Sequence, residues 1–219
     1  MSFLSRVGFF TVCLVVIGSA VYVTAYAVRN AVGNLYYIST EQLVKGAQGS
    51  LNLEDIQEIR IQAERVEFWT GDNPQYLLYL AQIERWMGNA SGYEPDIALI
   101  SNRLNKANSI RPVSAHQYSQ MSKESWYRGE PMQAIQHNLS NAQQLAPFDT
   151  QVALHSLDFY LSYWPSLSVE NKVITTQYLI SSNDYRITNE WELLFGDQTN
   201  KLRACSLLSF NDINNRYCE

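Results

Sequence analysis

Residues 7–28 read VGFFTVCLVVIGSAVYVTAYAV, a run of twenty-two residues without a charge between Arg6 and Arg29. As an α-helix this run would be about 33 Å long, enough to cross a hydrocarbon core of about 30 Å. Eleven of its side chains are Val, Leu, Ile or Phe, which favour insertion into a bilayer. The run predicts that residues 1–29 comprise a short tail and a transmembrane helix, with residues 7–28 in the membrane.

A cleavable secretory signal is the alternative reading of the same run. Ala25 and Ala27 form a small-x-small pattern of the kind found at signal cleavage sites, which would place the cut after Ala27. The run is longer than the apolar core of a signal peptide, which spans about 7–15 residues. Its length therefore favours an uncleaved anchor, and both readings export or tether the rest of the chain.

The cysteines indicate an oxidising compartment. Cys13 lies in the apolar run, whereas Cys205 and Cys218 lie close together at the C-terminus. Two cysteines confined to one end of a chain suggest a structural disulfide, which persists outside the cytoplasm. A pair of buried free thiols is the alternative. Zinc is not expected, because no histidine lies near these cysteines.

Charge and composition limit the remaining functions. From Asn30 onward the chain holds fourteen Lys and Arg against twenty-one Asp and Glu, and it has no basic stripe. An acidic surface repels phosphate backbones, so we expect no nucleic acid partner. The sequence GAQGS at residues 46–50 indicates a linker. We expect a membrane-proximal stalk and linker over residues 30–50 and one helical domain over residues 51–219.

Apolar residues in the expected domain recur three and four positions apart, which is typical of amphipathic helices. A first helix is expected after the capping residue Asn52, with an end at Gly71; two more are expected over Pro74–Met87 and Asp96–Ser109. Later stripes comprise Met132, Ile135, Leu139, Ala142 and Ala146; Leu154, Leu157, Leu161 and Trp164; and Leu202, Cys205 and Leu208, which would place Cys205 on a buried face. No strand pattern competes, so the domain is expected to be all-α.

The helices are spaced like repeats. Pro112 and Pro147 lie thirty-five residues apart, close to the tetratricopeptide period of about 34 residues. Between them, Gly129 stands at the expected turn, and Ala134 and Ala142 allow the two helices to approach closely. We therefore expect a tetratricopeptide-like α-solenoid of helix pairs after the transmembrane helix.

Four segments carry a family resemblance: DNPQYLL (72–78), IRPV (110–113), LAPFD (145–149) and YWPSL (163–167). Their order and spacing resemble the VpsP-type polysaccharide biosynthesis proteins. The resemblance implies a non-catalytic accessory protein of bacterial exopolysaccharide biosynthesis or export. The implied location is the bacterial inner membrane, with a single span and the C-terminal domain in the periplasm. The implied partners are membrane-embedded polysaccharide polymerase or export components.

Candidate partner-binding residues follow the Arg-Pro pair of the second segment. Arg111 could hold an acidic sugar or a partner's carboxylate through paired hydrogen bonds, or it could complement the end of the preceding helix. Family members tend to carry a tryptophan a few residues after this pair, where the chain has His116 and Tyr118, with its first following tryptophan at Trp126. We take these four residues as the candidate partner-binding set.

A search for catalytic residues finds no convergent group. His116, His137 and His155 are scattered without a zinc-binding spacing, and no phosphate-binding loop or nucleophile motif occurs. Glu190 and Glu192 are two positions apart, so on a helix they point to different faces. We expect no catalytic residue, metal or cofactor, and a protein-docking scaffold as the function. A general periplasmic chaperone or cell-envelope scaffold is the alternative, and a lipid-linked sugar hydrolase or ligase is a third hypothesis.

Overall fold

The computed structural model describes residues 3–47, 51–90 and 92–218. Within these ranges the chain is all-α, with ten α-helices (α1–α10), short 3₁₀ helices and no strand. The contacts between residues divide it into two compact units, Met1–Ile110 and Arg111–Glu219.

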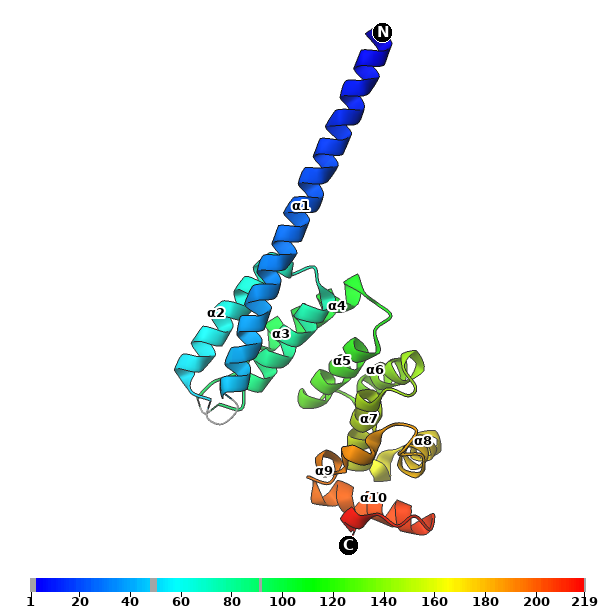
Figure 1. Ribbon diagram of the computed structural model, residues 1–219. Helices are drawn as coiled ribbons and strands as arrows, with labels where there is room; N and C mark the ends of the chain where they lie inside the picture. The colour runs from blue at the N-terminus through cyan, green and yellow to red at the C-terminus, as the bar shows by residue number, and fades with distance from the viewer. Residues whose placement is uncertain (1–2, 48–50, 91, 219) are drawn as a thin grey trace. The chain divides into compact units, whose positions relative to one another are not determined.

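The N-terminal unit contains four helices: α1 (Phe3–Gly46), α2 (Leu53–Thr70), α3 (Pro74–Met87) and α4 (Ile97–Ile110). Figure 1 shows α2 beside the second half of α1, and α3 beside α4. Because α2 also packs on α3, the two pairs form one unit.

The expected membrane segment and most of the expected stalk form one continuous helix, α1, of 44 residues. Among the described helices, α1 alone is long and apolar enough to cross a membrane, and within residues 11–28 every side chain except the partly buried Cys13 is exposed. Membrane anchors and signal segments share these properties. Downstream of Arg29 the helix packs on α2, where Gly33 lies so close to Thr70 that a Cβ atom would clash. Residues 30–46 are thus a packed helix, and residues 48–50 of the expected linker lie outside the described residues.

The predicted bounds of α2 and α3 are confirmed. The Asn52 side chain accepts a hydrogen bond from the Asp55 amide at 2.9 Å, and the Asp55 carboxylate accepts one from the Asn52 amide at 3.3 Å. This reciprocal cap satisfies amides that the first turn of α2 leaves unpaired. Pro74 occupies the first turn of α3, where its missing N–H costs no helical hydrogen bond.

A buried arginine connects three helices of the N-terminal unit. The predicted α2 stripe of Ile56, Ile59, Ala63 and Val66 is buried, and Arg103 of α4 lies beside it with only 3% of its surface exposed. Arg103 Nε donates to Glu67 Oε2 at 2.9 Å, and Nη1 donates to the Leu80 carbonyl at 3.2 Å. One side chain therefore ties α4 to both α2 and α3.

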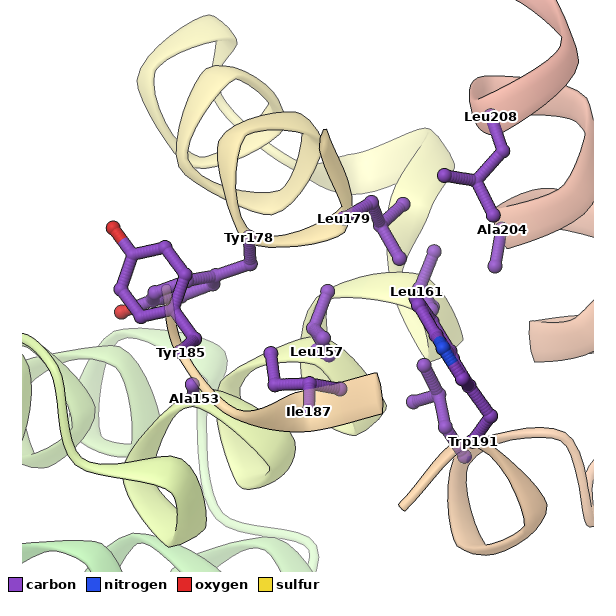
Figure 2. Packing of buried hydrophobic residues seen from close by; sticks show 11 residues of the cluster. Ala153, Leu157, Leu161, Tyr178, Leu179, Tyr185, Ile187, Trp191, Ala204 and Leu208 are labelled. Carbon is purple, nitrogen blue, oxygen red and sulfur yellow. The ribbon is translucent and has the colours of Figure 1, made fainter. Parts of the chain in front are cut away.

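The C-terminal unit contains α5 (Ala115–Tyr127), α6 (Met132–Leu145), α7 (Thr150–Ser162), α8 (Val169–Ile180), α9 (Trp191–Leu194) and α10 (Gln198–Phe210), with 3₁₀ turns η2 (Trp164–Ser166), η3 (Ile187–Asn189) and η4 (Arg216–Cys218). α5 pairs with α6, α7 pairs with α8, and α10 packs on both α7 and α8. In Figure 2, Leu157 and Leu161 of α7 point toward Leu179, Ile187, Trp191 and Leu208. α7 is thus the central helix of this core.

Small polar residues line the contact between α5 and α6. Ser119, Ser122 and Ser125 of α5 are buried, and the Ser122 hydroxyl donates to the Ile135 carbonyl of α6 at 3.2 Å. Gly129 has a φ of 66° in the turn between the two helices, a conformation that glycine adopts without steric cost. The turn predicted at Gly129 is confirmed.

Two stripe predictions in this unit are wrong in detail. Trp164 lies in η2 beyond the end of α7, because the following Pro165 disfavours a helical conformation at the residue before it. In α10, Cys205 is only half-buried and Leu202 is 60% exposed. The buried stripe is Asn200, Ala204 and Leu208, because the Asn200 amide donates to Asp158 of α7 at 2.9 Å and turns that face inward.

The structure joins Cys205 to Cys218 in a disulfide, with their Cα atoms 5.5 Å apart. The bridge ties η4 to α10, and Cys13 is free. A bridge across this short a loop stabilises by about 3 kcal/mol in the chain-entropy model.

We therefore expect that nonreducing mass mapping of membrane-extracted protein will recover one linked peptide containing Cys205 and Cys218. The Cys218→Ser variant, which opens the bridge, is expected to lower the free energy of unfolding by about 3 kcal/mol. Cys13→Ser is the matched control and should change neither result. Free thiols at both positions in protein extracted under alkylating conditions would contradict the prediction.

Candidate docking groove in the C-terminal unit

The four candidate partner-binding residues have separate surroundings. Arg111 is exposed ahead of α5, Tyr118 is half-buried within α5, and His116 Nε2 lies 3.7 Å from Asp149 Oδ2. Among the described residues, no hydrogen bond, ion pair or ring contact joins any two of the four. The structure therefore does not bring them together as one site, and their role in partner binding stays a prediction.

Trp126 belongs to a cluster of rings inside the unit. Its ring centroid lies 5.3 Å from that of Phe159 in an edge-to-face arrangement and 6.1 Å from that of Tyr163. Such arrangements stabilise an interior beyond the area they bury. The main contacts of Trp126 are thus with the core of its own unit.

An open groove of about 460 Å³ lies between α8 and α10. We call it the α8–α10 groove. Its apolar lining comes from three elements: Trp164 of η2, Val169, Val173 and Ile180 of α8, and Leu207 and Phe210 of α10. Val169 is 78% exposed and Phe210 is 86% exposed. Side chains of this size expose their apolar surface to water at a free-energy cost, and gathered in one hollow they mark a binding surface.

The groove exists because α8 is apolar on two faces. Tyr178 and Leu179 face the core of the unit and are almost fully buried. Val169, Val173 and Ile180 follow one another at spacings of four and seven residues, which places them on a second, uncovered face. α8 already packs on α7 and α10, and this second face nevertheless stays exposed, so it is a candidate surface for a partner.

A lysine lines the groove. Among the described residues, Lys172 is the sole charged residue in the lining, and its ammonium nitrogen lies 5.7 Å from the centre of the Trp164 ring. The ring face attracts the cation and holds it beside the apolar surface. The groove thus offers a wide apolar floor and a single positive charge.

A smaller cleft of about 160 Å³ lies between α5, α7 and α9, and it contains Lys123, His155 and Asp158. The Ser122 hydroxyl donates to the Ile135 carbonyl, so His155 Nε2 must carry its proton and donate to Ser122 Oγ at 3.2 Å. Burial lowers the pKa of His155 to about 3, which keeps the ring neutral. His155 therefore has a packing and hydrogen-bonding role.

The charged pair of this cleft is held apart. Burial lowers the pKa of Lys123 and raises the pKa of Asp158. No ion pair or hydrogen bond joins the two among the described residues, and Asp158 is held by the Asn200 amide instead. Within the described residues, no group of three or more His, Cys, Asp or Glu side chains could hold a metal ion.

The groove residues were not among the sequence candidates, although a signal for them exists. The apolar residues of 169–180 form two stripes, one with Val169, Val173 and Ile180 and one with Tyr178 and Leu179. Phe210 carries no such signal, because it is the last residue of α10 and a terminal residue adds little to a periodic pattern.

The fold and the groove define the class of the protein only broadly. It is an all-α protein with paired helices and one long apolar N-terminal helix that is a candidate membrane span. Searches of protein-family models, curated proteins and solved structures found no match to the chain.

Proposed function

We propose that this protein is a membrane-anchored, non-catalytic docking protein of bacterial exopolysaccharide biosynthesis or export. The observation that carries the proposal is the α8–α10 groove, a large apolar surface left open on a chain that also has an apolar helix fit to cross a membrane. The anchor would tether the chain to the membrane that holds the polymerase or export components. In this proposal the protein acts only by binding its partner proteins.

In this proposal the helix pairs are tetratricopeptide-like repeats. The pair α5–α6 lies between Pro112 and Pro147, the expected repeat boundaries, and the turn at Gly129 supports this assignment; the pairs α3–α4 and α7–α8 precede and follow it in the chain. Each repeat of a solenoid exposes an apolar face that the next repeat covers, and a last repeat needs a polar outer face to stay soluble. The groove beside α8 and α10 is an apolar face that no described helix covers.

The helical units lie in the periplasm in this proposal, and α1 is an uncleaved anchor in the inner membrane. The Cys205–Cys218 disulfide supports the location, since such bridges persist in oxidising compartments. The packing of α1 on α2 supports retention of the anchor. Arg29 of α1 already contacts Trp69 of α2, so cleavage after Ala27 would leave an α1 helix whose first residues are the ones that hold α2.

The occupant of the groove in this proposal is an amphipathic helix of a partner protein with one carboxylate on its flank. Two helices form the walls, and a third helix can lay a stripe of large apolar side chains between them. The three apolar α8 residues span eleven positions, or about 17 Å, which matches about three turns of a bound helix. Lys172, the single charge of the lining, would pair with the partner's carboxylate.

The proposal is tested with Val173→Glu, which places a charge in the floor of the groove. Because a carboxylate in an apolar interface is left without a partner, we expect partner affinity to fall at least about tenfold. Val113→Glu is the matched control, since Val113 is 69% exposed and lies outside the groove lining. Both variants should fold normally, because exposed substitutions change stability by about 0.5 kcal/mol or less.

The measurements are site-directed crosslinking from position 173 in intact membranes, and the amount and chain length of surface polysaccharide. The proposal expects a crosslink to a polymerase or export component, and a loss of polysaccharide with Val173→Glu that Val113→Glu does not share. Normal polysaccharide after deletion of the whole protein would overturn the pathway assignment and favour the general envelope scaffold or chaperone.

A further inference from the structure

The C-terminal end of α2 lies beside the point where the charge-free run of α1 ends. Arg29, the first charged residue after that run, donates from Nε to the Trp69 carbonyl and from Nη2 to Asp72 Oδ1 at 3.1 Å. One turn further along α1, Gly33 lies directly against Thr70. These contacts fix the position of the α2–α3 turn along α1. Figure 1 shows that α2 ends beside the point beyond which the N-terminal part of α1 extends away from the other helices of its unit.

If the charge-free run of α1 lies in a bilayer, the α2–α3 turn is at the level of the lipid headgroups. Gly33 lies five residues beyond Val28, or about 7 Å along the helix axis. A bilayer of about 40–45 Å has a hydrocarbon core of about 30 Å, which leaves about 5–8 Å of polar interface on each side. If the core ends at Val28, the contacts with Arg29 and Gly33 place Trp69 and Thr70 within this layer, and Phe68, one residue earlier on α2, lies at its outer edge.

Two aromatic residues occupy this end of α2. Phe68 is 77% exposed, and its ring lies edge-to-face against the Trp69 ring with a centroid distance of 5.4 Å. Trp69 is half-buried, with its carbonyl held by Arg29. Aromatic side chains, tryptophan above all, are enriched at membrane–water interfaces because the ring favours the boundary between apolar and polar surroundings.

The tyrosines of α1 that follow the run are engaged elsewhere. The Tyr37 ring stacks on the Tyr76 ring at 4.6 Å, and the Arg65 guanidinium lies 5.4 Å from the centre of the Tyr36 ring. These rings stabilise the packing of α1 on α2 and α3. An exposed aromatic ring at the membrane end of the unit therefore comes from α2.

We propose that Phe68 and Trp69 insert into the headgroup region of the bilayer and form a second membrane contact beside the transmembrane helix. The inference rests on the uncleaved anchor of the proposed function. A single helix leaves a domain free to tilt and to rotate about the helix axis. A second contact beside it fixes one face of the N-terminal unit against the membrane.

The charges at this end suit a lipid surface. The Arg29 cation is paired with Asp72, so it enters the interface with its charge compensated. Lys106 of α4 is exposed, and its ammonium nitrogen lies beside Gly71, next to the aromatic pair. A cation at this height would meet lipid phosphates, which attract lysine near a membrane surface. Bilayer headgroups therefore match both the exposed rings and the neighbouring charge.

The experiment measures membrane depth with a nitroxide spin label on the full-length protein. The protein is reconstituted in vesicles of phosphatidylethanolamine and phosphatidylglycerol, with Cys13→Ser as the background and the Cys205–Cys218 disulfide intact. Single labels are placed through Phe68→Cys, Leu53→Cys and Ile17→Cys. Leu53 is the matched control, since it is an exposed apolar residue (53%) at the opposite end of α2, about 22 Å along the helix from Phe68.

We expect collisions with dissolved oxygen to exceed collisions with a water-soluble nickel complex at positions 17 and 68, and the ratio to reverse at position 53. A label at 68 that behaves like the label at 53, while the label at 17 is lipid-buried, would overturn the second contact and leave the anchor standing. A label at 17 that is open to the nickel complex would overturn both the anchor and this inference. Protection of position 68 from both reagents would indicate that the label is buried against protein, within the chain or against a second copy of it, and would also reject the lipid contact.

Discussion

Replacing Phe159 by alanine is expected to lower the free energy of unfolding of the C-terminal unit by about 4 kcal/mol. Phe159 of α7 is fully buried, and its ring contacts the rings of Trp126, Tyr160 and Tyr163. Truncation removes the apolar surface that the ring buries and leaves a cavity that rigid neighbouring helices cannot fill. The ring contacts add to the loss, because their partners keep no equivalent neighbour.

Phe210→Ala is the matched control for this substitution. The two residues have the same side chain and both lie in helices of the C-terminal unit, but Phe210 is 86% exposed. Its truncation should change stability by about 0.5 kcal/mol or less, while it weakens partner binding at the groove. Urea unfolding of detergent-solubilised protein, followed by tryptophan fluorescence, measures both variants. Equal midpoints for Phe159→Ala and the control would contradict the packing that the structure describes.

Removing the carboxylate of Glu67 is expected to destabilise the N-terminal unit by about 3 kcal/mol. Arg103 is only 3% exposed; its Nε donates a hydrogen bond to Glu67 Oε2 at 2.9 Å, and its Nη2 forms an ion pair with the same oxygen at 2.8 Å. In Glu67→Ala the guanidinium stays buried without a counter-charge, and its hydrogen bond to the Leu80 carbonyl cannot replace the lost pair. Because the Glu67 side chain is 30% exposed, water partly screens its attraction to Arg103. The expected loss in the free energy of unfolding is therefore at the lower end of the range for buried ion pairs.

Two variants separate the charge effect from a general effect on α2. Glu64→Ala removes an exposed carboxylate from the same helix and should be almost neutral. The double variant Glu67→Leu with Arg103→Met removes both charges and should be more stable than Glu67→Ala, because no unpaired charge remains. Chemical denaturation monitored by circular dichroism gives the three free energies. A double variant less stable than Glu67→Ala would show that packing of the arginine stem, and not its charge, matters most.

Much of the fold could be predicted where one stripe of apolar residues lies between strong caps. The bounds of α2 and α3 follow from Asn52, Gly71 and Pro74, since these residues act on the backbone within one turn. α5 could not be predicted in the same way. Its buried face consists of Gln117, three serines and Glu124, so apolar periodicity is absent from it. Its partner α6 supplies the apolar surface, and only the assembled pair shows that α5 is buried.

The candidate sites were less predictable than the helices. From the sequence we predicted partner-binding residues around Arg111, whereas the structure has an apolar groove at Val169, Val173 and Phe210. A stripe of apolar residues carries no mark of whether another helix covers it, so exposure could not be predicted. The same holds for Phe68, whose position along α1 depends on the contact between Arg29 and the end of α2.

By itself, the sequence determined the local properties of this protein: an apolar helix long enough to span a membrane, an all-α chain, and the ends of its best-capped helices. These depend on interactions within a few residues of each other. Only the tertiary structure decided which apolar faces are covered, that Asn200 and not Leu202 faces the core, and that α2 ends level with Arg29. Such features depend on contacts between residues about forty positions apart, and no local pattern encodes those contacts.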